Sequence, residues 1–272
     1  MKRTGFLEPL KHHPSQPVQY ELKVDDQIIP LNDYLGREME IQFLDELRCQ
    51  FCGRKTKKFY GNNSSCFPCF KKLPNNDICI IKPELCHFHQ GTCRDNAFGE
   101  HHCMSPHIVY LALSSDIKVG ITRKNNQLNR WIDQGAVQAL PILEVPTRKE
   151  AGEAETYLSQ FITDKTNWRK MLKNEINEAD LYQTRKELIK KLPERFQPYI
   201  LPETEVYEFT YPQLQIPGKI TSLNLKKQPA IRGTLIGIKA QYLLFDTGVF
   251  QVRKHTGYKV AVSLNVSCEK DF

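Results

Sequence analysis

The chain has 272 residues, of which 40% are hydrophobic and 25% charged, and its formal net charge is +7 at pH 7. These proportions are ordinary for a soluble globular protein, and the length allows several domains. No stretch approaches the roughly 18 to 20 apolar residues of a membrane span, which excludes a helical integral membrane protein. We therefore expect no membrane among its partners. The first residues, MKRTGFLEPLKHHPSQP, lack the apolar core of a signal peptide. We therefore expect a cytoplasmic protein with reduced thiols.

The first segment, residues 1–48, alternates apolar and polar residues in VQYELKV and MEIQF, which is typical of short strands. Residues 1–47 sum to a charge of −4, whereas residues 48–105 sum to +5. The overall charge argues only weakly for a nucleic-acid partner, because two zinc sites of four thiolates each would lower it to about +3. Local basic runs such as RKTKK at 54–58 are the stronger indication.

The second segment, residues 49–105, is rich in cysteine and poor in long apolar runs. It cannot bury enough surface to fold by hydrophobicity alone, so bound metal must supply the difference. In a reducing compartment, clustered cysteines indicate metal before disulfides. Eight of the nine cysteines lie here, namely Cys49, Cys52, Cys66, Cys69, Cys79, Cys86, Cys93 and Cys103. The ninth, Cys268, is expected to be a lone buried thiol.

The spacing Cys49-Gln-Phe-Cys52 followed by Cys66-Phe-Pro-Cys69 predicts a zinc site of the zinc-ribbon type. Two cysteines separated by two residues turn onto one metal from a tight knuckle, and two knuckles complete a tetrahedron. With four thiolates the site has no open position, so its role is structural. Four free thiols in a loop-rich segment are the alternative.

The other four cysteines of this segment predict a second zinc site with a less regular spacing. Its expected ligands are Cys79, Cys86, Cys93 and Cys103. A neighbouring histidine can replace one thiolate, the candidates being His87, His89, His101 and His102. Redox sensing is the alternative, although nothing here resembles a resolving pair beside an activated thiol.

The third segment, residues 106–200, predicts a compact mixed domain. Two apolar runs form a hairpin over residues 107–122, and the amphipathic stretch NQLNRWIDQGA ends at Gly135, which fits a helix C-cap. The strand VQALPILEV, the helix TRKEAGEAETYLSQFIT and two charged helical stretches follow. We expect Trp131 in the core, with stacking on a nucleic-acid base as the alternative.

The hairpin resembles the two strand motifs of the GIY-YIG nuclease superfamily. Val109-Tyr110 matches the motif of the first strand, and Lys118-Val119-Gly120 matches that of the second. Two departures are plain: Lys118 stands where the superfamily has its second tyrosine, and the hairpin is shorter than usual. The resemblance implies a GIY-YIG-like α/β module over the third segment.

The resemblance also implies one cleft with Tyr110, Arg130, Glu155 and Asn167 in the places of the superfamily's site residues. Glu155 would bind a Mg²⁺ that keeps most of its waters, Arg130 would clamp phosphate, and Tyr110 would orient or deprotonate the nucleophile. Lys118 can act as a base only if burial or a nearby cation lowers its pKa; otherwise it contacts phosphate. The structural alternatives are Tyr110 as a core residue of the strand, Glu155 as a solvated helix residue and Arg130 paired with Asp133.

The last segment, residues 201–272, is rich in short β runs separated by glycines, which predicts a small β-barrel. Basic residues such as Arg253 and Lys254 could face RNA or a single strand, or could form a solvated rim. Finally, the strings CIIKPELCHF, GTCRDNAFGEHHC and RWIDQGA resemble an uncharacterised prokaryotic family, domain of unknown function 2797. That resemblance covers most of the chain, implies zinc and a GIY-YIG-like module, and supplies no substrate.

The sequence thus predicts an α+β multidomain protein with strands at 1–48, a zinc-binding segment at 49–105, a GIY-YIG-like domain at 106–200 and a small barrel at 201–272. The favoured function is a zinc-stabilised protein that binds DNA or RNA, with Mg²⁺-dependent cleavage as a candidate activity. A non-catalytic module for RNA or the translation machinery is the first alternative. A zinc-ribbon adaptor that binds another protein is the second.

Overall fold

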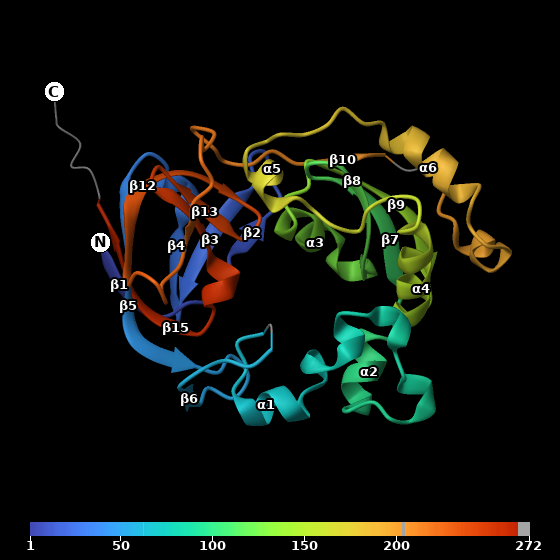
Figure 1. Cartoon of the computed structure of the whole chain (residues 1–272), viewed down its shortest axis with the longest axis horizontal. Coiled ribbons are helices and arrows are strands. Elements are labelled where there is room, and N and C mark those ends of the chain that lie inside the picture. Colours follow the sequence, from blue (N-terminus) through green and yellow to red (C-terminus); the bar gives the residue numbers. More distant parts are fainter. Residues whose placement is uncertain (62, 203–204, 266–272) are drawn as a thin grey trace. The chain divides into compact units, whose positions relative to one another are not determined.

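The computed structural model of the chain describes residues 1–61, 63–202 and 205–265, so Cys268 lies outside the described residues. Several sheets and short helices give a mixed α+β structure, as predicted (Figure 1). Within the described ranges, every helix is too short or too polar to cross a membrane.

The described residues of 1–70 and 210–265 form one compact unit, here called the strand-rich unit. Among its described residues, the main sheet joins eight strands in the order β1-β15-β5-β12-β13-β14-β11, with β6 paired to β5. These strands are β1 Lys2–Phe6, β5 Glu38–Arg48, β6 Lys55–Thr56, β11 Ser222–Leu223, β12 Ala230–Lys239, β13 Tyr242–Phe245, β14 Gly248–Gln251 and β15 Tyr258–Leu264. A smaller sheet holds β2 Lys11–His13, β3 Gln19–Val24 and β4 Gln27–Pro30.

The C-terminal strands do not close into a small barrel of their own, which corrects that prediction. β12 pairs with β5 through its first half and with β13 through its second, with a bulge between Leu235 and Gly237. β15 lies between β5 and β1. The N-terminal segment therefore supplies partners to the C-terminal strands, and the described strand path ends at β1 and β11 without closing.

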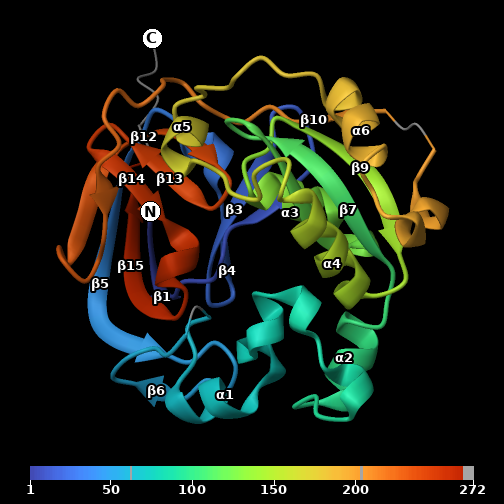
Figure 2. The ribbon, with the colours of Figure 1, turned by 45° about the vertical axis from the view of Figure 1, so that its right-hand side comes forward.

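The described residues of 71–209 form the second compact unit, here called the mixed unit. The predicted hairpin is present as β7 His107–Leu113 and β8 Ile117–Arg123, in a sheet of order β10-β9-β7-β8. Its other elements are α2 Asn96–His102, α3 Gln127–Asp133, β9 Gln138–Val145, α4 Arg148–Leu158, α5 Trp168–Leu172, α6 Leu181–Ile189 and β10 Tyr207–Glu208. Figure 2 shows α3, α4 and α6 around β7 and β9.

All seven residues of β7 are buried, because side chains from helices cover both of its faces. Val109 and Leu111 join a core cluster with residues of α4 and α6. Alternation along the strand turns Tyr110 to the other face, where its ring lies 5.7 Å from that of Trp131 on α3. Trp131 is fully buried, as the core interpretation expects, and Gly135 has φ +68° after α3, as a C-cap requires.

Tyr110 reaches past its neighbouring strand only because residue 120 is a glycine. Gly120 pairs with Tyr110, and a Cβ atom at that position would lie 2.7 Å from the Tyr110 Oη. We therefore expect Gly120→Ala to lower the free energy of unfolding by about 1–3 kcal/mol in a urea titration, the usual cost of overpacking a core. Gly218→Ala is the control, since a Cβ there meets nothing within 4 Å. Equal losses in the two variants would contradict the close approach.

Candidate functional site

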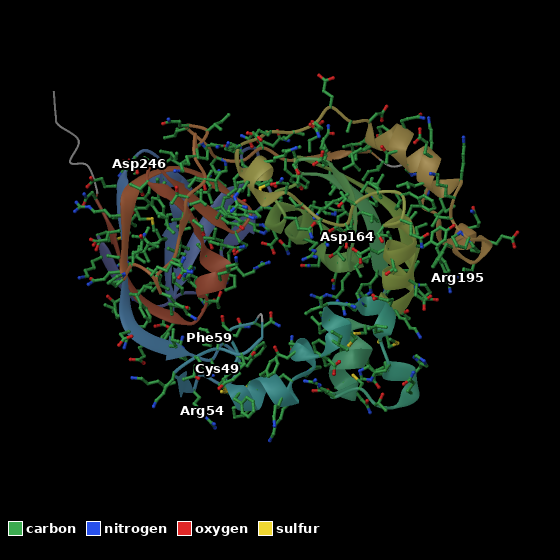
Figure 3. The ribbon with its side chains drawn as sticks, in the orientation of Figure 1. Cys49, Arg54, Phe59, Asp164, Arg195 and Asp246 are labelled. Atoms are coloured by element: carbon green, nitrogen blue, oxygen red, sulfur yellow. The ribbon has the colours of Figure 1, made fainter. Side chains whose placement is uncertain are left out.

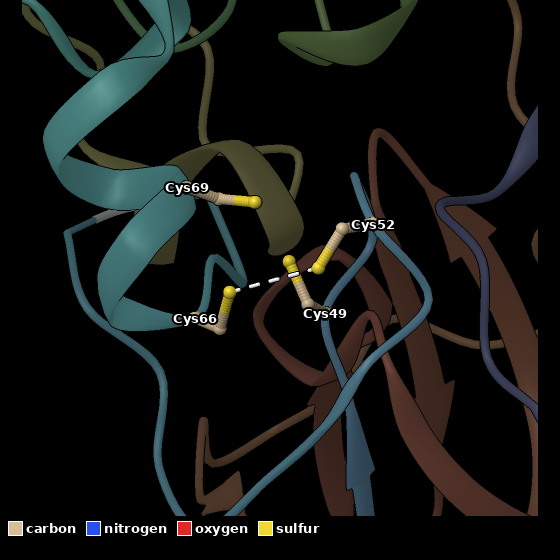
Figure 4. A group of neighbouring side chains, drawn as sticks. All are labelled: Cys49, Cys52, Cys66 and Cys69. Carbon is tan, nitrogen blue, oxygen red and sulfur yellow. Dashed lines mark hydrogen bonds between the residues drawn. The ribbon is translucent and has the colours of Figure 1, made fainter.

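The first cysteine cluster brings the predicted zinc ligands Cys49, Cys52, Cys66 and Cys69 together in the strand-rich unit (Figure 4). Their four sulfur atoms all lie within 4.8 Å of one another, and the Cys52 and Cys66 Sγ atoms are 3.7 Å apart. Four sulfurs around a zinc with bonds of about 2.3 Å stand about 3.8 Å apart at the corners of a tetrahedron. The donor set therefore fits a metal such as zinc.

Two local turns aim these thiols inward. The Gly53 N–H donates to the Cys49 carbonyl at 3.0 Å, with Gly53 at φ +68°, and the Phe70 N–H donates to the Cys66 carbonyl at 2.9 Å as α1 (Phe67–Lys72) begins. Burial disfavours the Cys49 thiolate, but backbone N–H groups, led by that of Cys66, lower its pKa to about 6. The turns thus supply both the geometry and part of the charge stabilisation that a metal ligand needs.

The second cysteine cluster lies in the mixed unit, where Cys79, Cys86, Cys93 and Cys103 all line one cavity of about 10 Å³. A cavity of this size holds about one water-sized atom. Cys79, Cys86 and Cys103 are buried, and burial, followed by the charge of Asp77, raises the pKa of Cys79 to about 11. The thiols predicted for a second zinc site are therefore gathered around a space for a single ion.

Asp77 and His87 also border this cavity and, with Cys79, form a second possible ligand group. Both are already engaged. Asp77 accepts from the Arg94 Nε at 2.6 Å, and the His87 ring contacts Asp77 at 3.5 Å through Nε2 and the Thr92 Oγ1 at 2.7 Å through Nδ1. Among the described residues, Asp77, Cys79 and His87 have their ligand atoms within 4.8 Å of one another, whereas the four thiols that line the cavity do not form such a group.

The third cluster, here called the hairpin cluster, consists of Tyr110, Lys118, Arg130 and Glu155, which come from β7, β8, α3 and α4. The fully buried Tyr110 hydroxyl donates to the Gln134 Oε1 at 2.9 Å and interacts with the Arg130 guanidinium. The charges of Arg130, Lys118 and Glu155 act on one another. The fold therefore brings these four predicted residues within electrostatic reach of each other.

Burial dominates the acid–base properties of the hairpin cluster. Burial, with the Arg130 charge, lowers the pKa of Lys118 to about 8, and Lys118 is 5% exposed. Burial raises the pKa of Glu155 to about 7, and the charge of Arg130 only partly opposes this. Burial also raises the pKa of Tyr110. Two groups that are normally charged at neutral pH are thus shifted towards their neutral forms, as is common where side chains perform acid–base chemistry.

Asn167, the fifth predicted site residue, is not part of the hairpin cluster. It is the N-cap of α5, where its Oδ1 accepts from the Lys170 N–H at 3.3 Å. Among the described contacts, none joins Asn167 to the hairpin cluster. Its visible role is to begin a helix.

Two side chains near the hairpin cluster were not predicted. The exposed Asp164 acts electrostatically on both Lys118 and Glu155 from the loop after α4 (Figure 3). Arg148, which opens α4 after a capping box at Thr147, donates to the Cys79 and Ile80 carbonyls at 2.6 and 2.8 Å. Arg148 therefore ties the second cysteine cluster to the helix that carries Glu155.

The raised pKa of Glu155 makes a pH-dependent contribution to stability. Because the folded state holds the proton more tightly than the unfolded state, this contribution is complete below about pH 4.5 and is lost as the pH rises through about 7. Glutamine does not ionise, so Glu155→Gln should gain thermal stability relative to the wild type between pH 5 and 8, measured by calorimetry. Glu153→Gln is the control, because it removes another carboxylate of α4, one that pairs with Arg195 at 3.0 Å. A melting-temperature difference that is constant with pH would contradict the shift.

In a comparison with known proteins, the chain matches one family, whose description names no activity. The model of the family described as "Protein of unknown function (DUF2797)" matches residues 36–260. This range contains both cysteine clusters and the whole hairpin cluster. No curated protein and no solved structure matches the chain. The side chains themselves are therefore the basis for any functional assignment.

Proposed function

Because this chain belongs to the DUF2797 family, whose description assigns no activity, we propose its function from its own side chains. We propose a zinc-stabilised protein that binds nucleic acid and cleaves phosphodiester bonds at the hairpin cluster, within a module of GIY-YIG type. The partner is DNA or RNA. The main support is that three charged side chains from separate elements interact beside the buried Tyr110 hydroxyl. The charges of Arg130 and Glu155 act on Lys118, and those of Arg130 and Lys118 act on Glu155.

Each member has a role that phosphodiester hydrolysis requires. Lys118 is the general base, since a lysine of pKa about 8 keeps part of its population neutral at physiological pH. The exposed Arg130 binds the phosphate oxygens through its planar guanidinium and stabilises their charge in the transition state. Tyr110, held by Gln134, orients the attacking water or the phosphate through its hydroxyl.

Glu155 and Asp164 are the carboxylates for a divalent cation. Burial, and to a smaller extent the charge of Asp164, disfavours the charged form of Glu155, so a cation would relieve an existing cost. Mg²⁺ is bound through one or two carboxylates together with waters and substrate phosphate, which this donor set fits. When bound, it would supply positive charge near the leaving oxygen.

Two structural zinc ions complete the proposal, one at Cys49, Cys52, Cys66 and Cys69 and one at Cys79, Cys86, Cys93 and Cys103. The tetrahedral spacing of the first group and the single-ion cavity of the second support this assignment. The second zinc would hold the segment before β7 against α4 through Arg148 and so help to position Glu155.

A second candidate is binding without cleavage. Tyr110 is 0% and Lys118 5% exposed, so Arg130 is the member of the hairpin cluster that solvent reaches most easily. A substrate would contact the other groups only after side-chain movement. In this candidate, Lys118 and Arg130 together attract phosphate, and no bond is cut.

The test is incubation of the purified protein with Mg²⁺ and labelled single- and double-stranded DNA and RNA. Cleavage that is lost in Glu155→Gln and kept in Glu153→Gln supports the proposed site. Binding without any cleavage favours the second candidate. If the protein neither binds nor cleaves nucleic acid at physiological salt, both candidate functions are contradicted. The adaptor function then remains.

A further inference from the structure

A second surface feature lies in the strand-rich unit, and its lining includes none of the cysteines of the first cluster. A pocket of about 610 Å³ opens between β5, β6 and the turn before β12. Its size is within the range of small-molecule and cofactor sites. The lining residues are Phe43, Asp45, Leu47, Lys55, Thr56, Lys57, Leu225, Lys226, Pro229 and Tyr258.

Two aromatic rings form part of the pocket wall. The ring centroids of Phe43 and Tyr258 are 5.1 Å apart at 49°, and the ring of Phe59, which Figure 3 labels, lies 5.9 Å from that of Tyr258. Tyr258 is buried, whereas Phe43 is partly exposed and lines the pocket. The exposed part of Phe43 offers a flat apolar surface, and its neighbours hold it in place. Such a surface suits the stacking of a planar ring.

The rim of the pocket is basic. Lys55, Lys57 and Lys226 are exposed and line it together with one acidic residue, Asp45. Lys55 approaches Glu46 at 3.6 Å, but its side chain is 72% exposed, and an ion pair of this kind contributes little. The lysines are therefore available to an anionic ligand. A pocket with an aromatic wall and a cationic rim matches a base attached to phosphates.

We propose that this pocket binds one nucleotide of a single-stranded nucleic acid. The base stacks on Phe43, and the flanking phosphates lie against Lys55, Lys57 and Lys226. A base inside a duplex cannot reach the ring without leaving its stack, so the pocket selects unpaired strands. The proposal rests on nucleic-acid binding as proposed above, but it needs neither cleavage nor the hairpin cluster.

The test is fluorescence anisotropy with a labelled single-stranded oligonucleotide of about ten nucleotides, a typical site size. Phe43→Leu keeps an apolar side chain but removes the ring, and we expect it to weaken binding about tenfold. Lys226→Glu should weaken binding and lower the salt dependence by about one phosphate contact. The matched control is Lys227→Glu, because Lys227 is the exposed neighbour in sequence and does not line the pocket.

The outcomes separate this proposal from the hairpin cluster. Loss of single-strand binding in the pocket variants, with binding kept in Lys227→Glu and Glu153→Gln, supports it. Equal loss in Lys226→Glu and Lys227→Glu indicates a general charge effect and overturns it. Displacement of the oligonucleotide by polyglutamate as readily as by unlabelled strand also overturns it. If Phe43→Leu leaves single-strand binding unchanged while the protein still cleaves at the hairpin cluster, the pocket proposal is refuted and the proposed function stands.

Discussion

Cys66→Ser is expected to remove one zinc ion per chain and to unfold the segment that β6 and α1 frame. The four thiols lie at the spacing of a tetrahedral site, and the segment between them offers few buried apolar side chains in their place. Zinc supplies about 10–16 kcal/mol of binding free energy in small zinc-finger peptides, and that energy is available only to the folded form. Losing one of four ligands should therefore cost several kcal/mol of local stability.

The metal content is measured by mass spectrometry of the purified protein, and local unfolding by hydrogen exchange over residues 49–70. We expect two zinc ions in the wild type and one each in Cys66→Ser and Cys86→Ser. Cys268→Ser, which removes a thiol outside both clusters in the sequence, should leave both ions bound. Unchanged metal content in Cys66→Ser would contradict the first site, and one zinc in the wild type would contradict the second.

How far the sequence predicts this structure depends on how local each feature is. The first cysteine cluster follows from spacing alone, because each Cys-x-x-Cys pair is aimed by its own turn, as the Gly53 and Phe70 hydrogen bonds show. The hairpin and the capped helices α3 and α4 are equally local, since alternation and caps define them within one element.

Strand pairing is not local, and here the prediction of a C-terminal barrel is wrong. The alternation in β12 marks a strand but does not say that Ala230–Thr234 pairs with β5 while Leu235–Lys239 pairs with β13. Asp164 was missed for the same reason. It lies in a loop without periodicity, and only the return of the chain past α4 brings its charge to Lys118 and Glu155.

Lys118→Arg distinguishes a base from a phosphate contact. Arginine keeps the positive charge but cannot lose its proton in a protein. If Lys118 is the base, the variant should still bind nucleic acid while cleavage falls about 10²- to 10⁴-fold, the usual contribution of general base catalysis. Lys118→Met should lose cleavage and also weaken binding. Lys124→Arg, on an exposed lysine that pairs with Glu144 at 2.8 Å, is the matched control.

The pH profile gives a second readout, which a structural role for Lys118 would not produce. A base of pKa about 8 and a carboxylate of pKa about 7 must both be deprotonated, so the cleavage rate should rise from about pH 6 and level off above about pH 8. Lys118→Arg should remove the upper step and leave that of Glu155. Binding should weaken as the pH rises, because the neutral lysine attracts phosphate less. A rate that Lys118→Arg leaves unchanged would make Lys118 a charge contact and assign the base to another group.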